Sequence, residues 1–188
     1  MSTQPVLRRW TYDEFARLPN DGNRYEIIGG ELIVTPAPTL LHQKIITRLG
    51  RRLDAFVEAN GLGEVFNGPV DVLFGEGDYL EPDLVFVRRD RLHIIGPNGF
   101  EGAPDLVVEV LSPTTALRDR GIKRECYARF LVPEYWIVDP VAKRIEVYRL
   151  TEDADRPSVI ATTSLEWQPL RGGATLSLDV PDLLRAFR

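Results

Sequence analysis

The chain has 188 residues, which is enough for one well-filled hydrophobic core and short for two domains. Its hydrophobic content of 44% and charged content of 27% exclude disordered and fibrous proteins, and no apolar run approaches the roughly 18 residues of a membrane span. The formal net charge of −5 argues against a protein that holds nucleic acid by positive charge spread over its whole surface.

The N-terminus and the cysteine count both bear on the cellular location. The stretch MSTQPVLRRWTYDEF has no apolar segment of the kind that secretion signals need. Cys126 is the one cysteine, so an internal disulfide cannot form, as is usual in a reducing compartment. We therefore expect a cytoplasmic protein with no membrane partner.

Positive charge is concentrated in two segments. The first contains Arg48, Arg51 and Arg52, and the second contains Arg118, Arg120, Lys123, Arg124 and Arg129. Such clusters are usually solvated faces, so alone they are weak evidence for contact with phosphate groups. A DNA-binding protein of this composition would need one of them, because Lys and Arg side chains that neutralise phosphates supply much of the affinity.

The first third of the chain predicts a short helix, a hairpin and a long helix. Thr11 and Glu14 form a capping-box pattern, and the helix that they open is expected to end near Pro19. The segment RYEIIGGELIV, residues 24–34, predicts a hairpin that turns at Gly29-Gly30. Residues 39–60 carry apolar side chains at helical spacing, and Asn60-Gly61 is typical of a helix end.

The two faces of the predicted hairpin differ in character. One face carries Glu26, Ile28, Glu31 and Ile33. We expect the other face to lie against the core, since it is made of Tyr25, Ile27, Leu32 and Val34.

The rest of the chain predicts strands around one further helix. The strands are expected at about 63–74, 83–88, 105–111, 134–139 and 144–150. The segment DLVVEVL at 105–111 has five Val and Leu residues in seven, which is typical of a strand covered on both faces. A helix is predicted at roughly 117–131, with Ile122, Cys126 and Phe130 along its apolar line. Residues 151–188 predict a polar loop, a possible strand pair and a short helix opened by Pro181.

This order of elements predicts an α/β fold. A strand, a crossover helix and a further strand imply a mixed sheet with helices packed on it. We see no repeat, linker or change of composition, so residues 1–188 are interpreted as one domain.

Glu109 is the most informative residue for chemistry. It sits inside the strand at 105–111, where the neighbouring residues indicate burial, and a buried carboxylate is costly unless it is paired or metal-bound. One interpretation is a glutamate satisfied by an arginine or by backbone amides. A functional interpretation requires a second acidic group on a neighbouring strand.

Asp83 supplies such a group at the start of the strand at 83–88. With Glu109 it could hold a divalent cation through oxygen ligands, as magnesium sites usually do with one or two carboxylates plus waters. Asp105 is a less suitable partner, because four residues along one strand separate it from Glu109 by roughly 13 Å. Alone, Asp83 would be interpreted as a turn or cap residue.

Lys123 completes a possible catalytic set. Asp119, Lys123 and Tyr127 follow one another at four-residue spacing beside the apolar line of the predicted helix, so Lys123 can reach inward. The alternative is a surface ion pair with Asp119. In phosphodiester hydrolysis a metal activates water and polarises the phosphate, while a cation offsets the developing charge.

The stretches EPDLVFV, GAPDLVVEVLSPTT and RDRGIKRECYARFLVPEYWIVDP, within residues 81–140, resemble the Uma2 (DUF820) family. RYEIIGGELIV and the pair His42-Gln43 extend the resemblance over about residues 10–150. It implies a PD-(D/E)XK restriction-endonuclease-like core of helix, three strands, helix and strand. It also implies that Asp83 and Glu109 are the acids of the motif. The residue two after Glu109 is Leu111 where the superfamily has lysine, and the resemblance points to Lys123 in its place.

Other residues could support this site. His42 opens the long helix and could orient a water or a phosphate, although a histidine there is more often a cap or packing residue. Glu26 and Glu31 could add a further acid, and a solvent-facing role for them is equally open. Possible phosphate contacts are Arg118, Arg120 and Arg124.

The leading hypothesis is therefore an endonuclease that hydrolyses phosphodiester bonds in DNA with Mg²⁺ or Mn²⁺ as cofactor. RNA as the substrate stays open, because it would use the same site chemistry. The alternative is a catalytically inactive module of the same fold for nucleic-acid binding or partner recruitment, motivated by the acidic net charge and the displaced lysine. Since two strands of a duplex need two sites, we expect a homodimer.

Overall fold

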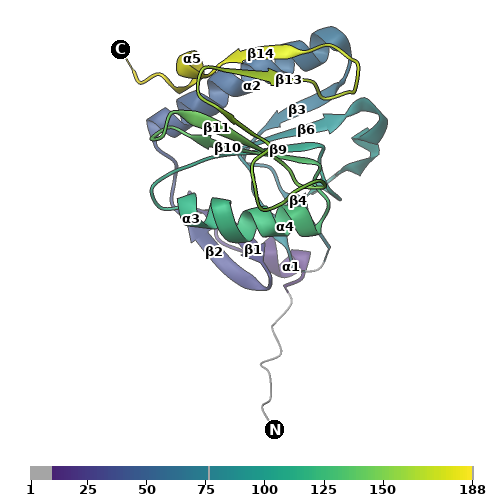
Figure 1. The fold of residues 1–188 in the computed structure, drawn as a ribbon. Coiled ribbons are helices and arrows are strands. Elements are labelled where there is room, and N and C mark those ends of the chain that lie inside the picture. The colour runs from purple at the N-terminus through teal and green to yellow at the C-terminus, as the bar shows by residue number, and fades with distance from the viewer. Residues whose placement is uncertain (1–9, 76, 188) are drawn as a thin grey trace.

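The computed structural model describes residues 10–75 and 77–187 and places them around one central mixed sheet (Figure 1). The strands of this sheet lie in the order β12-β11-β10-β9-β6-β3. Their bounds are β3 Gly63–Asn67, β6 Leu84–Arg88, β9 Leu106–Val110, β10 Glu134–Asp139, β11 Arg144–Arg149 and β12 Val159–Ala161. Only β9 and β10 pair in parallel, and the other neighbours pair antiparallel. The predicted mixed α/β fold is confirmed.

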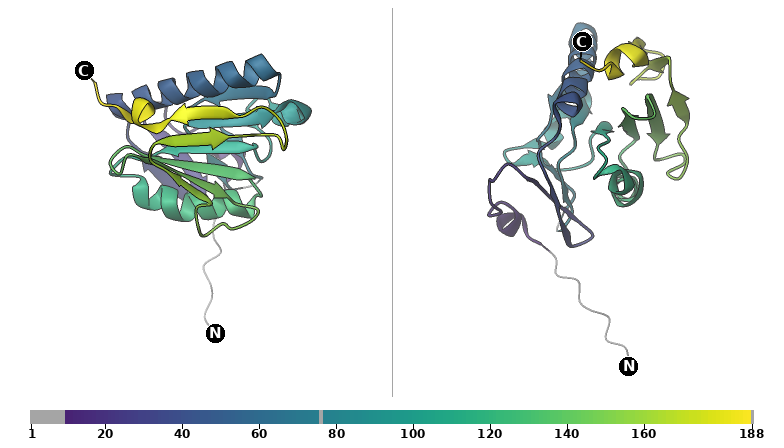
Figure 2. Two further views of the ribbon diagram at one scale, coloured as in Figure 1. Left: turned by 45° about the horizontal axis from the view of Figure 1, so that its top comes forward. Right: turned by 90° about the vertical axis from the view of Figure 1, so that its left-hand side faces the viewer.

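Helices cover both faces of the sheet (Figures 1 and 2). The long helix α2, Leu40–Asn60, lies on one face, with Thr39 as its N-cap and Gly61 in the left-handed conformation at its end. The crossover from β9 to β10 lies on the other face and consists of α3 Ala116–Arg118, the π-helical turn η2 Asp119–Lys123 and α4 Arg124–Arg129. No helix among the described residues is long and apolar enough to span a bilayer.

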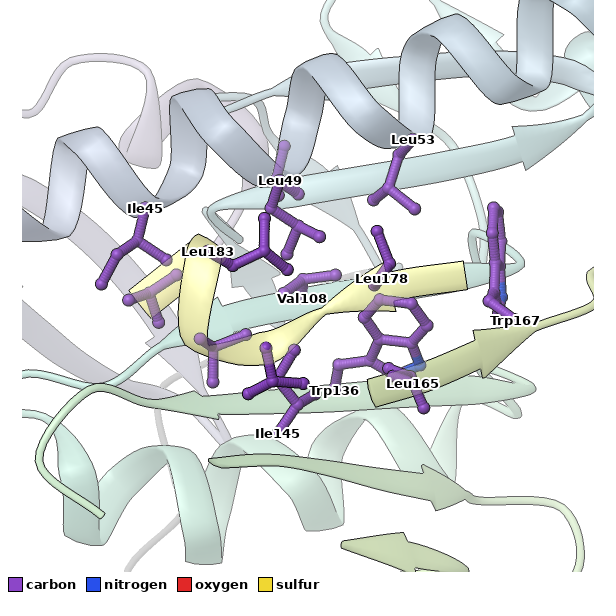
Figure 3. Close-up of a cluster of buried hydrophobic side chains, with 14 of the residues drawn as sticks. Ile45, Leu49, Leu53, Val108, Trp136, Ile145, Leu165, Trp167, Leu178 and Leu183 are labelled. Atoms are coloured by element: carbon purple, nitrogen blue, oxygen red, sulfur yellow. The ribbon is translucent and has the colours of Figure 1, made fainter. Parts of the chain in front are cut away.

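The C-terminal part closes the core on the α2 side (Figure 3). The antiparallel pair β13 Ser164–Trp167 and β14 Leu176–Asp179 is followed by α5 Val180–Leu184, as predicted for this segment. The ring of Trp167 meets that of Trp136 edge-on, with centroids 5.8 Å apart and an interplanar angle of 83°. Both tryptophans are therefore structural residues of this core.

A second sheet was not predicted. Its order is β2-β1-β5-β4-β8-β7, with β1 Arg24–Ile28, β2 Glu31–Thr35, β4 Val72–Leu73, β5 Tyr79–Leu80, β7 Ile95–Gly96 and β8 Gly99–Phe100. The 3₁₀ helix η1, Arg89–Ile94, leads from β6 to β7. Strands of two residues are too short for a period-two pattern to reveal them.

The predicted strand at 63–74 is wrong as a single element. The chain leaves the central sheet after β3, at Gly68-Pro69, and β4 belongs to the second sheet. Proline has no N–H to donate to a ladder, which favours a break at this point.

The hairpin has the predicted register, with Glu26 opposite Ile33 and Ile28 opposite Glu31. The predicted core face is wrong, because Glu26 and Ile28 are buried against the body of the protein. On the other face Leu32 and Val34 are 40% and 46% exposed. The short helix α1, Tyr12–Phe15, which ends earlier than expected, covers that face only around Ile27. Alternation separates two faces of a strand but does not say which one is covered.

The predicted helix at 117–131 is interrupted by η2, and its apolar line is shifted. Ile122 is 36% exposed, whereas Asp119, Lys123 and Tyr127 are buried. The helix line of Asp119, Lys123 and Tyr127 therefore faces inward. It is stabilised there because Lys123 forms ion pairs with the buried Glu109 on β9 and Glu26 on β1.

Candidate active site

A cavity of about 330 Å³ opens where the hairpin, the first turn of α2 and the end of β9 meet. Its charged lining residues are Arg24, Glu26, Asp83, Glu109, Arg118, Asp119 and Lys123, and His42 lines it as well. The loops 35–39 and 112–115 form the rest of the wall. Four carboxylates thus face three permanent cations in one enclosed space.

Asp83 lies immediately before β6 and is 1% exposed. Leu84 pairs with Val108 in the antiparallel ladder, so continuing that register places Asp83 opposite Glu109 on the same face of the sheet. Directly opposed side chains have Cβ atoms about 5 Å apart. The Val110 N–H donates to Asp83 Oδ2 at 2.8 Å, which fixes the carboxylate against β9.

Glu109 points from β9 toward the crossover helix, because Leu106, Val108 and Val110 occupy the opposite face. Its Oε1 lies 2.6 Å from Lys123 Nζ and accepts a hydrogen bond from the Tyr127 hydroxyl at 3.0 Å. The structure therefore brings together the three residues Asp83, Glu109 and Lys123 in one cavity.

Lys123 contacts two more acids than predicted. Its Nζ lies 2.8 Å from Glu26 Oε1 and 3.8 Å from Asp119 Oδ1. The pair with Asp119 is not a surface pair, since both side chains are buried. The four-residue spacing of Asp119, Lys123 and Tyr127 is the sequence signal that places Asp119 on the same inward line of the helix.

Burial and charge shift the acidity of this cluster. Burial alone would lower the pKa of Lys123, but the carboxylates of Glu109, Glu26 and Asp119 raise it above its ordinary value. Burial raises the pKa of Glu109 well above its usual range, and the charge of Lys123 offsets only part of that. The pKa of Asp119 is raised for the same reasons. One ammonium group does not balance three buried carboxylates.

Arg24 is the site residue that sequence reasoning missed. It stands on β1 two residues before Glu26, on the same face, and its Nη1 lies 2.7 Å from Asp83 Oδ1. That two-residue spacing was the available signal once Glu26 had been considered. Burial alone would raise the pKa of Asp83, but the hydrogen bond from His42 and the charges of His42 and Arg24 outweigh it and lower the pKa.

His42 lies in the first turn of α2 and lines the cavity. Its Nε2 is 3.1 Å from Asp83 Oδ2, while its Nδ1 is buried with no hydrogen-bond partner among the described residues. Its position suits a residue that orients the Asp83 carboxylate.

Of the remaining predicted site residues, one lines the cavity and three do not. Arg118 lines the cavity, whereas Glu31 is exposed at the hairpin turn and does not. Arg120 binds Glu146 and Asp139 at the outer strands, so it points away from the cavity. Arg124 donates to the carbonyl of Ala154 and lies near Asp155. Burial among acids on β10 and β11 explains why Arg120 is unsuited to contact phosphate here.

The donor set fits a hard divalent cation that keeps several waters. Asp83 and Glu109 offer carboxylate oxygens on adjacent strands, and magnesium commonly uses one or two carboxylates plus waters. Within residues 10–75 and 77–187, no three His, Cys, Asp or Glu side chains are grouped as a ready-made metal cage. A structural zinc site is therefore a poor fit for these residues.

The fold and the cavity define a mixed α/β protein with an acidic, lysine-containing site where β6 begins and β9 ends in its central sheet. The chain belongs to the Uma2 family, whose sequence model, described as "Putative restriction endonuclease", matches residues 12–181. This confirms the resemblance and extends it toward the C-terminus.

A solved structure has the same fold. It is a crystal structure of a putative nuclease belonging to DUF820 from Anabaena variabilis, with a TM-score of 0.75 and 22% sequence identity. The similarity covers 93% of this chain and 97% of that one. No curated protein matches the sequence significantly.

Proposed function

We propose that this protein is a metal-dependent endonuclease that hydrolyses phosphodiester bonds in DNA. The observation that carries the proposal is the convergence of Asp83, Glu109 and Lys123 in one cavity. Membership of the Uma2 family supports it. The reaction class follows from the chemistry of the side chains, since two acids and an ammonium group suit phosphoryl chemistry.

Each residue of the cavity has a role in this proposal. Asp83 and Glu109 would hold Mg²⁺ or Mn²⁺, which when bound supplies an activated water and polarises the phosphate. Lys123 stabilises negative charge that develops on the phosphate oxygens, and Tyr127 holds Glu109 in place through its hydroxyl. Arg24 pairs with Asp83 and can turn to a phosphate oxygen, because a guanidinium binds phosphate in a planar, two-pronged geometry.

Cleavage assays with matched variants test the proposal. Supercoiled DNA with Mg²⁺ or Mn²⁺ is incubated with wild type, Asp83→Asn and Glu109→Gln. The control is Glu31→Gln, which removes an exposed acid of the same hairpin outside the cavity. We expect cleavage to fall about 100-fold or more in the two site variants and to persist in the control. Full activity in either site variant, with its circular dichroism unchanged, contradicts the assignment. Parallel assays on RNA decide the substrate.

A second candidate is a nuclease-fold module that binds nucleic acid or a partner without catalysis. Its support is that both acids already have cationic partners, Asp83 in Arg24 and His42, and Glu109 in Lys123. Calorimetric titration of Mn²⁺ into wild type and Glu109→Ala separates the two functions. Binding that is lost in the variant supports the nuclease, whereas a wild type that binds no Mn²⁺, with or without DNA, supports the module.

A further inference from the structure

The two arginine-rich segments of the sequence differ in how many of their cations form ion pairs in the structure. Four of the five cations of the second segment have acidic partners: Arg120 binds Glu146 and Asp139, Lys123 binds three acids, Arg124 lies near Asp155, and Arg129 binds Asp78. Arg118, in the cavity wall, has no acidic partner among the described residues. The positive charge of the second segment is therefore largely unavailable to a polyanion.

The first segment keeps its charge. Lys44, Arg48, Arg51 and Arg52 follow at spacings of four, three and one residues on α2, so they share one helix face. We call these four residues the basic face. The apolar face of Ile45, Leu49 and Leu53 points into the core (Figure 3), and the basic face lies beside it around the helix. Among the described residues, neither Lys44 nor Arg51 has an acidic side chain within ion-pair distance, and Arg52 contacts Asp182 at 3.6 Å.

The chain after α5 adds a hollow to the basic face. An open hollow of about 380 Å³ is lined by Lys44, Arg48, Arg185, Ala186 and Phe187. Arg48 Nη1 donates to the carbonyls of Leu183 and Arg185 at 3.1 and 2.6 Å, while its Nε is buried without an acceptor among the described residues. Burial and the nearby charge of Arg185 lower the pKa of Arg48, which indicates cations that crowd one another.

This hollow fits an anion of the size of a phosphate group. It presents three cationic side chains, whereas Asp182 binds Arg185 and Arg52 at its border. A row of cations along a helix matches a chain of phosphates better than a single small anion, because the charge continues to Arg51 beyond the hollow.

The basic face begins within one turn of α2 from the cavity wall. The first turn of α2 contributes Thr39 and His42 to the cavity wall. A rise of 1.5 Å per residue places Lys44 about 3 Å and Arg51 about 14 Å further along the helix axis than His42, and 3.6 residues per turn put both on the side of α2 that is turned away from His42. The first turn of α2, α3 and the hairpin lie toward the same side of the molecule (Figures 1 and 2).

We propose that the basic face of α2, together with Arg185, holds the phosphate backbone of DNA whose scissile bond enters the cavity. This inference rests on the proposed function for its choice of partner. It explains how a chain of net charge −5 can hold a polyanion, since Lys44, Arg48 and Arg51 on this surface have no acidic partner among the described residues.

The test is the salt dependence of DNA binding, measured without cleavage. Fluorescence anisotropy of a labelled duplex is recorded in EDTA at roughly 50 to 200 mM salt, a range over which counterion release dominates. The variant Lys44→Ala/Arg51→Ala is compared with Arg156→Ala/Arg171→Ala, which removes two exposed cations elsewhere. Arg48 is left intact, because it bonds the carbonyls after α5.

Each phosphate contact contributes about 0.9 to the slope of log affinity against log salt. Losing two contacts lowers the slope by about 1.8, so a fourfold rise in salt weakens binding about twelvefold less in the Lys44/Arg51 variant than in wild type. The Arg156/Arg171 variant should behave as wild type.

Each outcome decides a separate point. Equal slopes in both double variants, or a wild type that binds no duplex, overturn the inference. If wild type cleaves DNA and the Lys44/Arg51 variant keeps its affinity, the surface is wrong and the nuclease stands. If the slope falls but no DNA is ever cleaved, the surface stands and the nuclease is wrong.

Discussion

Lys123 holds together the densest group of charges in the described structure. Lys123 is 5% exposed, and its ammonium contacts Glu109, Glu26 and Asp119. An unpaired buried charge costs several kcal/mol, so each member depends on the others. The cluster keeps acids in a cavity that would otherwise exclude them.

Arg24 should compete with a divalent cation for Asp83. Because Arg24→Gln removes the cation 2.7 Å from Asp83 Oδ1, we expect Mn²⁺ to bind about tenfold more tightly in calorimetric titration. DNA cleavage should fall at the same time, since the phosphate loses its guanidinium. Asp83→Asn is the control that should lose Mn²⁺ binding. Weaker Mn²⁺ binding in Arg24→Gln would show instead that Arg24 positions the carboxylate.

Glu134 should make stability depend on pH at a place remote from the cavity. Burial raises its pKa above the ordinary value, and the hydrogen bond from Trp136 Nε1 at 2.5 Å and the charge of Arg149 offset only part of this. A folded-state pKa above the unfolded one gives stability that is complete at low pH and lost as pH rises through the folded pKa.

The variant Glu134→Gln removes this titration and keeps an acceptor for Trp136. We therefore expect its free energy of unfolding, from urea titrations between pH 4 and 8, to fall less with rising pH than that of wild type. Parallel curves for the two proteins would mean that the pKa of Glu134 is the same in the folded and unfolded states.

At the scale of elements, the π-helical turn η2 decides what the crossover presents to the cavity. Such turns are frequent at functional sites, since they reorient side chains within a helix. Here both acidic Asp119 and basic Lys123 face inward, while Ile122 is left partly exposed. The Tyr135 hydroxyl donates to the carbonyl of Asp119 at 3.0 Å, which anchors the turn to β10.

We expect the ion pairs of Arg120 to provide most of the attachment of η2 to the central sheet. Arg120 binds Asp139 on β10 at 2.8 Å and Glu146 on β11. Arg120→Met should lower the free energy of unfolding by about 1–2 kcal/mol, because Asp139 loses its ion pair and buried Glu146 keeps only Arg144 as a cationic partner. Hydrogen exchange at 119–123 should accelerate. Arg118→Met is the control, and equal protection in both variants would contradict this role.

The hairpin β1–β2 brings two residues to the site across a long stretch of sequence. Arg24 reaches Asp83 and Glu26 reaches Lys123, so the hairpin forms one wall of the cavity. The Glu81 N–H also donates to Glu26 Oε1 at 2.9 Å, which ties this wall to the segment before β6.

At the scale of the whole molecule, the central sheet separates two hydrophobic cores and carries the cavity where β6 begins and β9 ends. Side chains of β9 alternate between them, with Val108 in the α2 core and Val107 in the core under α4. The acids thus sit where rigid strands end, which suits a site whose geometry has to be maintained.

A homodimer is the prediction at this scale. One chain has one such cavity among its described residues, whereas cleavage of both strands of a duplex needs two. Size-exclusion chromatography with light scattering should give twice the mass of the 188-residue chain at micromolar concentration. A single-chain mass, unchanged on addition of duplex, would contradict it.

Most of the fold could be predicted because its signals are local. Thr39 and Gly61 bound α2 through capping and a left-handed residue, which depend on a few neighbouring positions. The strands around Glu109 follow from their apolar composition. The second sheet could not be predicted, since its two-residue strands form only where distant segments meet.

The candidate site was likewise predictable only where its signals are local in the sequence. The sequence alone determined that Asp83 and Glu109 are acids at strand positions where burial is costly, because strand periodicity and composition are properties of adjacent residues. Only the tertiary structure decided that Arg24 neutralises Asp83, that Glu26 and Asp119 share Lys123, and that Arg120 turns away. The physical reason is that ion pairs form between side chains that folding brings together. A linear pattern contains the spacing along each element but not which elements become neighbours.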